Sequence, residues 1–233
     1  MTTNFYAPPS AIRGHRVVLP DEEARHARSV LRVAAGDRMT VVDGEGGWYR
    51  VQVDHVAEAQ VVGHIVESKE GVGEPEVEVT LGIGLIRKRD RFETFVEKAV
   101  ELGVRRIVPL RTRHTETDTL RRDRTQKVMV AALKQCRRSW LPELAPVQTL
   151  DDLLDDSGAD RQFLCTGGEG HPPLRRAAEG AAAVQVLVGP EGGFSEQEVA
   201  HALEAGCEPV SLGRRRLRAE TAGIAAVHAV VGP

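Results

Sequence analysis

The sequence predicts an α/β protein preceded by a small β-rich unit, and three observations support this prediction. From residue 77 onward, apolar strand segments alternate with helical segments, which is typical of a parallel sheet covered by helices. Within residues 1–70, several short strand segments surround one helical segment, which favours a compact β-barrel. Residues 71–76 are polar and contain glycine, which predicts a linker. We therefore expect a barrel at 1–70 and an α/β domain at 77–233.

The N-terminal unit is predicted to combine short strands with one helix. Residues 16–19 form an apolar strand segment. Residues 21–32 predict a helix, because acids occupy its first turn and arginines its last, as the helix dipole favours. Residues 36–53 predict two strands joined by a glycine-rich turn, and residues 60–66 predict one more strand.

The α/β domain is predicted to begin with a strand–helix–strand unit. An apolar strand at 77–86 precedes a helix in which Asp90 and Glu93 resemble a capping box and Gly103 marks the end. A strand at 105–110 completes the unit. The remaining strands are expected at 162–165, 184–188 and 209–212, and the remaining helices at 124–138, after Ser195 and at 220–231.

The composition is that of a globular protein. Of 233 residues, 41% are hydrophobic and 28% are charged, which is enough apolar material to bury a core. No apolar run approaches the roughly 18 residues that span a bilayer, and the N-terminus lacks the pattern of a signal peptide. The three cysteines form no CxxC pair, so they indicate neither a disulfide framework nor a zinc site. We expect a cytoplasmic protein with no metal and no membrane partner.

The segment LVGPEGGFSEQEV, Leu187–Val199, leaves a strand through a glycine-rich loop and enters a helix at once. Ser195 and Glu198 form a capping box at the start of this helix. Gly192 and Gly193 lack Cβ atoms, so the loop backbone can approach a ligand closely. Loops at the carboxyl ends of parallel strands are where α/β sheets bind ligands. A tight turn without a ligand is the alternative that the pattern leaves open.

Acidic side chains near this loop favour a neutral or cationic ligand over a phosphate. Glu191, Glu196 and Glu198 lie where a phosphate would bind, and like charges repel at short range. The sequence also lacks the glycine motifs that bind nucleotide phosphates. S-adenosylmethionine, whose sulfonium is positive, is a ligand that suits this loop.

The segment SLGRRRLRAETAG, Ser211–Gly223, repeats the order of strand end, glycine, loop and helix. Two glycine-bearing loops after successive strands predict opposite walls of one pocket. This second loop is rich in cations beside apolar Leu212 and Leu217, which indicates either a solvated basic loop or a cluster for nucleic-acid phosphates. Its arginines are Arg214, Arg215, Arg216 and Arg218.

Together the two segments resemble the bacterial 16S ribosomal RNA (uracil-N3)-methyltransferases of the SPOUT superfamily. The resemblance extends to DRFETFVEKAVELGVRRIVPL, to LKQCRRSWLPEL and to HARSVLRVAAGDRM in the N-terminal unit. It implies an S-adenosylmethionine-dependent enzyme that methylates N3 of a uridine in the 16S rRNA of the small ribosomal subunit. It also implies a PUA-like RNA-binding barrel at 1–70, a SPOUT-type parallel sheet with helices on both faces, a homodimer and a trefoil knot. The knot would break the rule that chains do not thread.

We expect the cofactor to contact both glycine loops. The glycines offer close approach to the backbone, and the leucines offer apolar contact to adenine. The expected cofactor-binding residues are Leu164, Thr166, Gly189, Glu191, Gly192, Gly193, Leu212, Gly213 and Leu217.

Methylation at N3 requires an unpaired or flipped uracil whose N3 proton leaves. Glu220 and Glu191 are alternative general bases, and each has a structural alternative, as an ion pair or as part of a turn. Arg218 is expected to steady the uracil oxygens or to bind a phosphate. We therefore expect Arg218 and Glu220 as the catalytic residues.

The net charge of −3 hides a strong segregation of charge. From Arg105 to Arg138 the chain has eleven Lys and Arg against three Asp and Glu, whereas from Ser139 to Asp160 it has none against six. This segregation favours a phosphate-binding groove over a solvated basic face. The expected RNA-binding residues are Arg13, Arg28, Arg32, Arg121, Arg122, Lys134, Arg137, Arg138 and Arg214.

Two other functions fit the same patterns. One is a non-catalytic RNA-binding protein that uses the basic groove, and it would bind no S-adenosylmethionine. The other is an α/β enzyme with a different adenosine-containing ligand, and it would transfer no methyl group to RNA. The final helix has a broad apolar surface, which indicates either a buried core helix or a dimer interface.

Overall fold

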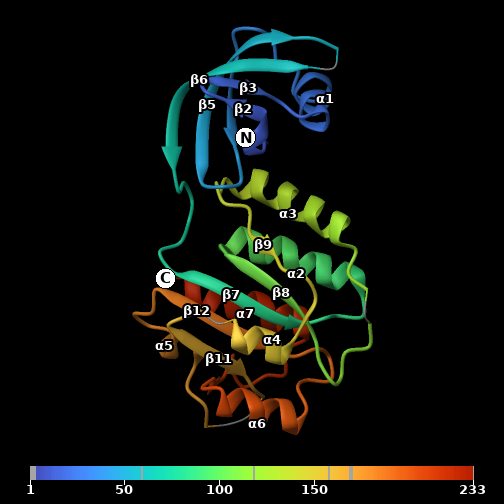
Figure 1. The fold of residues 1–233 in the computed structure, drawn as a ribbon, viewed down its shortest axis with the longest axis vertical. Helices are drawn as coiled ribbons and strands as arrows, with labels where there is room; N and C mark the ends of the chain where they lie inside the picture. The colour runs from blue at the N-terminus through green and yellow to red at the C-terminus, as the bar shows by residue number, and fades with distance from the viewer. Residues whose placement is uncertain (1–3, 59, 118, 157, 168–169, 233) are drawn as a thin grey trace. The chain divides into compact units, whose positions relative to one another are not determined.

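The computed structural model describes residues 4–58, 60–117, 119–156, 158–167 and 170–232, in two compact units (Figure 1). The N-terminal unit comprises Met1–Glu74 and Val130–Leu141, and the C-terminal unit comprises Pro75–Met129 and Pro142–Pro233. The change of unit after Glu74 falls within the predicted linker, 71–76. The sequence did not predict that Val130–Leu141 would group with the N-terminal unit.

The N-terminal unit is built on a curled sheet that has six strands among the described residues, in the order β1-β4-β5-β6-β3-β2. Neighbouring strands are antiparallel except β1 and β4. The register shifts twice along the longest pair, β5 and β6, and such irregularities increase the local twist of a sheet. The elements are β1 (Phe5–Tyr6), η1 (Pro9–Ala11), β2 (Ile12–Arg13), β3 (Arg16–Val18), α1 (Asp21–Ser29), β4 (Arg38–Val42), β5 (Gly47–Val56) and β6 (Val61–Glu70).

The core of this unit lies between the curled sheet and α1. Val41 and Val51 of the sheet and Ala27 of α1 are fully buried in one apolar cluster. Alternate residues of a strand face the same side, which explains why Val51 and Val53 both enter this core. Helix α1 ends at Ser29, before the predicted end at residue 32.

The C-terminal unit is built on a sheet whose strand pairings are all parallel among the described residues. Its order is β10-β8-β7-β12-β11-β13, with β9 beside β8. The strands are β7 (Glu78–Gly84), β8 (Arg106–Arg111), β9 (Glu143–Leu144), β10 (Gln148–Thr149), β11 (Arg161–Cys165), β12 (Ala183–Val188) and β13 (Glu208–Val210). The helices are α2 (Arg89–Leu102), α3 (Arg122–Cys136), α4 (Leu150–Asp155), α5 (Leu174–Ala177), α6 (Glu196–Glu204) and α7 (Ala219–Val231). Helix α3 begins in the C-terminal unit and ends in the N-terminal unit.

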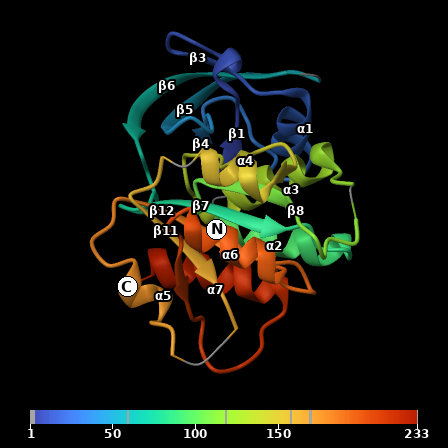
Figure 2. The ribbon, with the colours of Figure 1, turned by 60° about the horizontal axis from the view of Figure 1, so that its bottom comes forward.

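Helices cover both faces of this parallel sheet, so the predicted fold class is confirmed (Figure 1; Figure 2). On one face α2 and α7 pack together so closely that a Cβ on Gly223 would lie 2.8 Å from the ring of Phe95. On the other face, Leu153 of α4 and Ala202 of α6 share a core with Leu187 of β12. The trefoil knot remains a prediction from the resemblance.

Of the three predicted capping signals in the C-terminal unit, two are confirmed and one is wrong. Gly103 ends α2 in the left-handed conformation with φ of 110°, and Ser195 and Glu198 form the predicted capping box of α6. The predicted box at Asp90 is wrong, because Lys88 is the N-cap of α2 and makes no side-chain cap bond. Glu93 instead accepts hydrogen bonds from Arg124. No helix in the described part of the chain is long and apolar enough to cross a membrane.

Candidate functional site

The glycine loop after β12 is held in a tight turn that only glycine fits at several positions. The backbone N–H of Gly193 donates to the carbonyl of Pro190 at 2.8 Å, and Gly193 has a φ of 72°. A Cβ on Gly189 would lie 3.0 Å from the Cα of Gly193, where the loop folds back on itself. The glycines therefore shape the turn as well as keep its surface open.

A second loop lies at the carboxyl end of β13 and leads into α7. Its first turn is fixed by Ser211, whose Oγ accepts from the backbone N–H of Gly213 at 3.1 Å. Gly213 has a φ of 113°, a conformation that favours glycine. Arg218 is the N-cap of α7, so its side chain projects from the start of that helix.

The two loops line one cavity of about 930 Å³ in the C-terminal unit. The carboxyl ends of β11 and β12 also contribute, which is the position where α/β sheets bind ligands. The structure brings the following predicted residues together around it: Thr166, Gly189, Glu191, Gly192, Gly193, Leu212, Gly213, Leu217 and Arg218.

Leu164 departs from this prediction. It is fully buried in the core beneath the sheet and does not line the cavity. Side chains alternate along a strand, so Leu164 and Cys165 point to opposite faces, and Cys165 reaches the cavity instead. Burial raises the pKa of the Cys165 thiol to about 12, which keeps it protonated and unreactive at neutral pH.

Thr166 has an unsatisfied hydroxyl at this cavity. Its backbone N–H donates to the carbonyl of Val210, but its Oγ1 is buried and has no partner among the described residues. An unpaired buried polar group costs about 1–3 kcal/mol. A bound ligand that hydrogen bonds with this hydroxyl would remove the cost, so the residue fits a polar cofactor.

Arg91, in the first turn of α2, also lines the cavity, and sequence reasoning missed it. Its Nε lies 3.6 Å from Oε1 of Glu220, and both side chains are largely buried. Oε2 of Glu220 is buried without a hydrogen-bond partner in the described part of the chain. Helix α2 follows β7, and β7 is adjacent to β12, so residues just after β7 lie near the glycine loop after β12. The position of Arg91 shortly after a strand end is the sequence signal that could have identified it.

The charge around the cavity differs from the prediction. Glu191 is the one carboxylate among the described lining residues. Glu198 is turned away, because its carboxylate accepts from the backbone N–H groups of Ser195 and Arg113 at 2.8 Å. The lining cations outnumber the single lining acid, so the acidic side chains do not give the cavity the negative character that the sequence indicated. The lining cations are Arg91, Arg215, Arg216 and Arg218, with His171 beside them.

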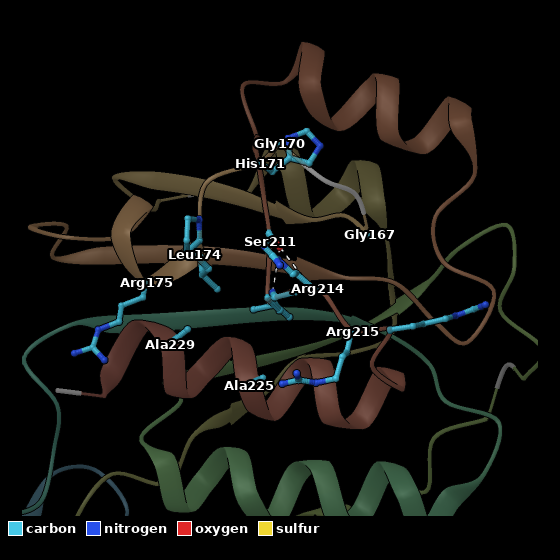
Figure 3. Close-up of a pocket in the computed structure, with 14 residues that line it drawn as sticks. Gly167, Gly170, His171, Leu174, Arg175, Ser211, Arg214, Arg215, Ala225 and Ala229 are labelled. Atoms are coloured by element: carbon cyan, nitrogen blue, oxygen red, sulfur yellow. Dashed lines mark hydrogen bonds between the residues drawn. The ribbon is translucent and has the colours of Figure 1, made fainter.

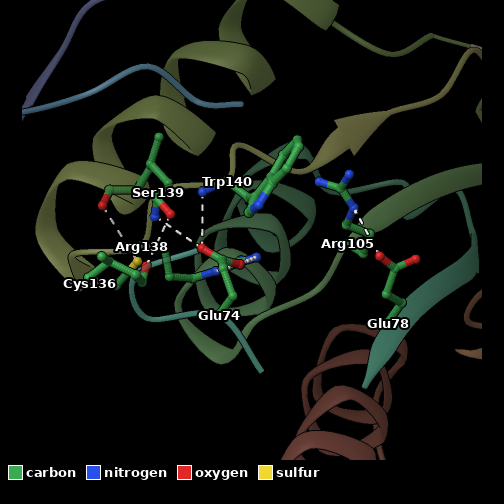
Figure 4. A network of polar contacts seen from close by, with 9 residues as sticks. Glu74, Glu78, Arg105, Cys136, Arg138, Ser139 and Trp140 are labelled. Carbon is green, nitrogen blue, oxygen red and sulfur yellow. Dashed lines mark hydrogen bonds and ion pairs between the residues drawn. The ribbon is translucent and has the colours of Figure 1, made fainter. Parts of the chain in front are cut away.

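Arg138 has a structural partner that removes it from the predicted RNA-binding set. It is only 2% exposed, and its guanidinium donates to Glu74 at 2.6 Å. The same carboxylate accepts from the backbone N–H groups of Ser139 and Trp140 at 3.0 Å (Figure 4). This network ties the predicted linker to the segment after α3 within the N-terminal unit.

Three further residues of the predicted RNA-binding set form ion pairs or hydrogen bonds with other groups of the protein. Lys134 pairs with Glu23 at 2.5 Å. Arg122 donates to the carbonyls of Leu144 and Ala145, and Arg28 donates to the carbonyls of residues 57 and 58. Arg122 is nevertheless exposed, and the other exposed members are Arg13, Arg32 and Arg137 in the N-terminal unit and Arg121 and Arg214 in the C-terminal unit.

A family model described as an RNA methyltransferase domain matches residues 73–231, and a model described as an RNA methyltransferase PUA domain matches residues 19–63. The chain belongs to this RNA methyltransferase family. Membership confirms the resemblance that the two glycine loops indicated.

Curated relatives of the family are similar over most of their length. Ribosomal RNA small subunit methyltransferase E of Synechocystis sp. is 30% identical, over 95% of this chain and 75% of the relative. The protein of the same name from Aquifex aeolicus is 31% identical, over 92% of this chain and 93% of the relative.

Solved structures of family members share the fold. The ribosomal RNA small subunit methyltransferase E of Neisseria gonorrhoeae, bound to S-adenosyl methionine, has a TM-score of 0.89 at 30% identity and covers 98% of this chain and 96% of its own. A probable rRNA-methyltransferase of Porphyromonas gingivalis has a TM-score of 0.88 at 30% identity, with 98% of each chain covered.

Proposed function

We propose that this protein transfers the methyl group of S-adenosylmethionine to N3 of a uridine in the 16S rRNA of the small ribosomal subunit. The observation that carries the proposal is a cavity that both glycine loops line at the carboxyl edge of the parallel sheet. The family membership of the chain and the cofactor-bound relative from Neisseria gonorrhoeae support it.

The cavity has the groups that hold such a cofactor. Gly189 and Gly193 present backbone without side chains, Leu212 and Leu217 offer apolar contact to adenine, and Thr166 has a hydroxyl without a partner among the described residues. When bound, S-adenosylmethionine supplies an electrophilic methyl group on a sulfonium. Closeness of the reacting atoms in a shielded cavity contributes much of the rate in such transfers.

The cations of the cavity fit the nucleobase. Loss of the N3 proton leaves negative charge on the uracil oxygens, and Arg218 and Arg91 line the cavity in which that charge would develop. Glu191 also lines the cavity, whereas Glu220 does not. The geometry therefore favours Glu191 as the proton acceptor and Glu220 as a positioning residue that acts through Arg91.

The remaining parts of the proposal concern organisation. We assign a PUA-like RNA-binding barrel to 1–70, a linker to 71–76 and a SPOUT-type methyltransferase domain to 77–233. The exposed Arg13, Arg32 and Arg137 support RNA binding by the N-terminal unit. We further propose a cytoplasmic homodimer, supported by the partly exposed apolar residues of α7, Ile224, Val230 and Val231.

One experiment tests the proposed reaction. The purified protein, tritiated S-adenosylmethionine and small ribosomal subunits without the modification are incubated, and the rRNA is digested to nucleosides. We expect label in N3-methyluridine. If calorimetry detects cofactor binding but the RNA carries no label, the protein has another substrate. If calorimetry detects no cofactor binding, the protein is a non-catalytic RNA-binding protein.

A further inference from the structure

The glycine loop after β12 lines the proposed cofactor cavity but not the cavity beside it. That neighbouring cavity is lined by α5, the loop after β13 and α7 (Figure 3). It shares Leu212 and Gly213 with the cofactor cavity, whereas its described lining contains no residue of 189–194. A group that fixes the glycine loop therefore affects the cofactor cavity rather than its neighbour.

Glu198, in the first turn of α6, makes hydrogen bonds in two directions. Its Oε2 accepts from the backbone N–H of Ser195 at 2.8 Å and from the hydroxyl of Ser195 at 2.9 Å, within the capping box of α6. Its Oε1 accepts from the backbone N–H of Arg113 at 2.8 Å, although Arg113 is 85 positions away in the sequence. The carboxylate therefore connects the exit of the glycine loop with a turn that follows β8.

The turn that contains Arg113 is closed by its own hydrogen bonds. The backbone N–H of Thr112 donates to Oγ1 of Thr115 at 2.9 Å, and the backbone N–H of Thr115 donates to the carbonyl of Thr112 at 3.1 Å. Thr112 is also buried. The amide of Arg113 is thus held in place before Glu198 binds it, so little conformational freedom is lost when the bond forms.

A helix cap alone does not need the bond to Arg113. Helix α4 begins with the same kind of capping box, in which Oδ2 of Asp152 accepts from the backbone N–H of Thr149 at 3.0 Å. Within the described part of the chain, the side chain of Asp152 forms hydrogen bonds with Thr149 alone. One carboxylate oxygen is therefore enough for such a box, and Glu198 uses its other oxygen to bind a distant turn.

We propose that Glu198 is a positioning residue that holds the glycine loop in the shape that binds the cofactor. The inference rests on the proposed function. Phe194 and Val199 line the cofactor cavity, and each is adjacent in sequence to one end of the capping box of α6. Loss of the bonds of Glu198 would therefore move the wall of the cavity. Glu198 is not among the described lining residues, so it acts through the backbone of the loop.

The test compares two variants of Glu198 with two matched controls in the full chain. Glu198→Ala removes both sets of hydrogen bonds, and Glu198→Gln retains one carbonyl oxygen. The control Asp152→Ala removes the matching capping box of α4, and the control Arg113→Ala retains the backbone N–H that Glu198 binds. Calorimetry measures the affinity for S-adenosylmethionine, and thermal unfolding measures Tm. Steady-state methylation of small ribosomal subunits separates KM for the cofactor from kcat.

We expect Glu198→Ala to bind S-adenosylmethionine about tenfold more weakly, because hydrogen bonds to a carboxylate are stronger than neutral ones. Glu198→Gln should lose about threefold, because its single carbonyl oxygen can replace only one of the two carboxylate oxygens. KM for the cofactor should rise in proportion, while kcat at saturating cofactor stays within about twofold. Both controls should bind the cofactor as the wild type does, although Asp152→Ala should lower Tm by about 2–4 °C.

Wild-type cofactor affinity in Glu198→Ala would overturn the inference and leave the proposed function in place. An equal loss of affinity in Asp152→Ala would also overturn it, because the effect would then follow from a general loss of stability. A loss in Arg113→Ala would show that the guanidinium, rather than the bond to Glu198, supports the loop. If Glu198→Ala does not fold, wild-type affinity in Glu198→Gln overturns the inference instead. A wild type that binds no S-adenosylmethionine would refute the proposed function itself.

Discussion

The Nδ1 atom of His114 lies 3.1 Å from the carbonyl oxygen of Gly193, although the two residues are 79 positions apart. Since a carbonyl only accepts, His114 donates this hydrogen bond. A Cβ on Gly192 would lie 2.8 Å from the Cβ of His114, so the two loops are in close contact. The loop after β8 thus braces the glycine loop after β12, across the intervening strand β7.

His114→Ala should weaken S-adenosylmethionine binding about fivefold, because one hydrogen bond contributes about 1 kcal/mol to holding the loop. His114→Asn, which retains a donor, should recover part of the loss. His15→Ala, at an exposed histidine of the N-terminal unit, is the control. Calorimetry measures the affinities. If His114→Ala bound S-adenosylmethionine with wild-type affinity, the hydrogen bond from His114 to Gly193 would not be needed to hold the cofactor loop.

Gly193→Ala should abolish most cofactor binding. The φ of 72° is strained for alanine, and no protein atom lies within 4 Å of the new Cβ, which would occupy ligand space instead. Gly180→Ala is a matched control, with a φ of 79°, an equally open Cβ and a position outside the cavity. Both variants should lose about 1–2 kcal/mol of unfolding free energy, but only Gly193→Ala should lose affinity. Equal cofactor binding by the two would place the ligand elsewhere.

Glu220→Gln should lower the rate of methyl transfer about tenfold and leave cofactor affinity unchanged. The substitution removes the charge that holds Arg91, and Glu220 itself does not line the cavity. Glu196→Gln, at an exposed carboxylate of α6, controls for a change in net charge. Single-turnover rates with saturating cofactor measure the effect. If Glu220→Gln reacted at the wild-type rate, the ion pair would have only a structural role.

Arg138→Ala should destabilise the protein by about 3–5 kcal/mol, because it leaves the buried carboxylate of Glu74 without its ion-pair partner. Arg137→Ala, at the exposed neighbour, should leave stability nearly unchanged and weaken RNA binding. Urea denaturation and RNA titrations separate the two effects. A stable Arg138→Ala variant with weak RNA binding would restore Arg138 to the RNA-contacting set.

Cys165 should resist alkylation by iodoacetamide up to about pH 9 in the folded protein, because burial raises its pKa to about 12. The raised pKa also has a consequence for stability. Above the ordinary thiol pKa of 9.0, the thiol of the unfolded chain loses its proton while the thiol of the folded chain keeps it. The contribution of this thiol to the free energy of unfolding is therefore complete below pH 9.0 and is lost as the pH rises toward 12. Cys165→Ala should make the unfolding free energy fall less steeply in this window. Rapid alkylation at neutral pH would contradict the burial.

Local patterns in the sequence predicted much of the C-terminal unit. The alternation of apolar strands with helices predicted the parallel sheet, Gly103 predicted the end of α2, and Ser195 with Glu198 predicted the start of α6. The same kind of signal was overlooked at Thr149 and Asp152, whose capping box starts α4. These signals act through hydrogen bonds and periodicities within a few residues, so they can be found without the fold.

The sequence by itself determined the fold class, the family and the two glycine loops. Only the tertiary structure decided that Arg91 lines the cavity, that Glu220 lies beside Arg91 and outside the cavity lining, and that Arg138 is buried. It also decided that Val130–Leu141 belongs with the N-terminal unit. The physical reason is that burial and pairing depend on segments far apart in the chain, and an arginine that binds a phosphate has the same local sequence signal as one that pairs with a distant carboxylate.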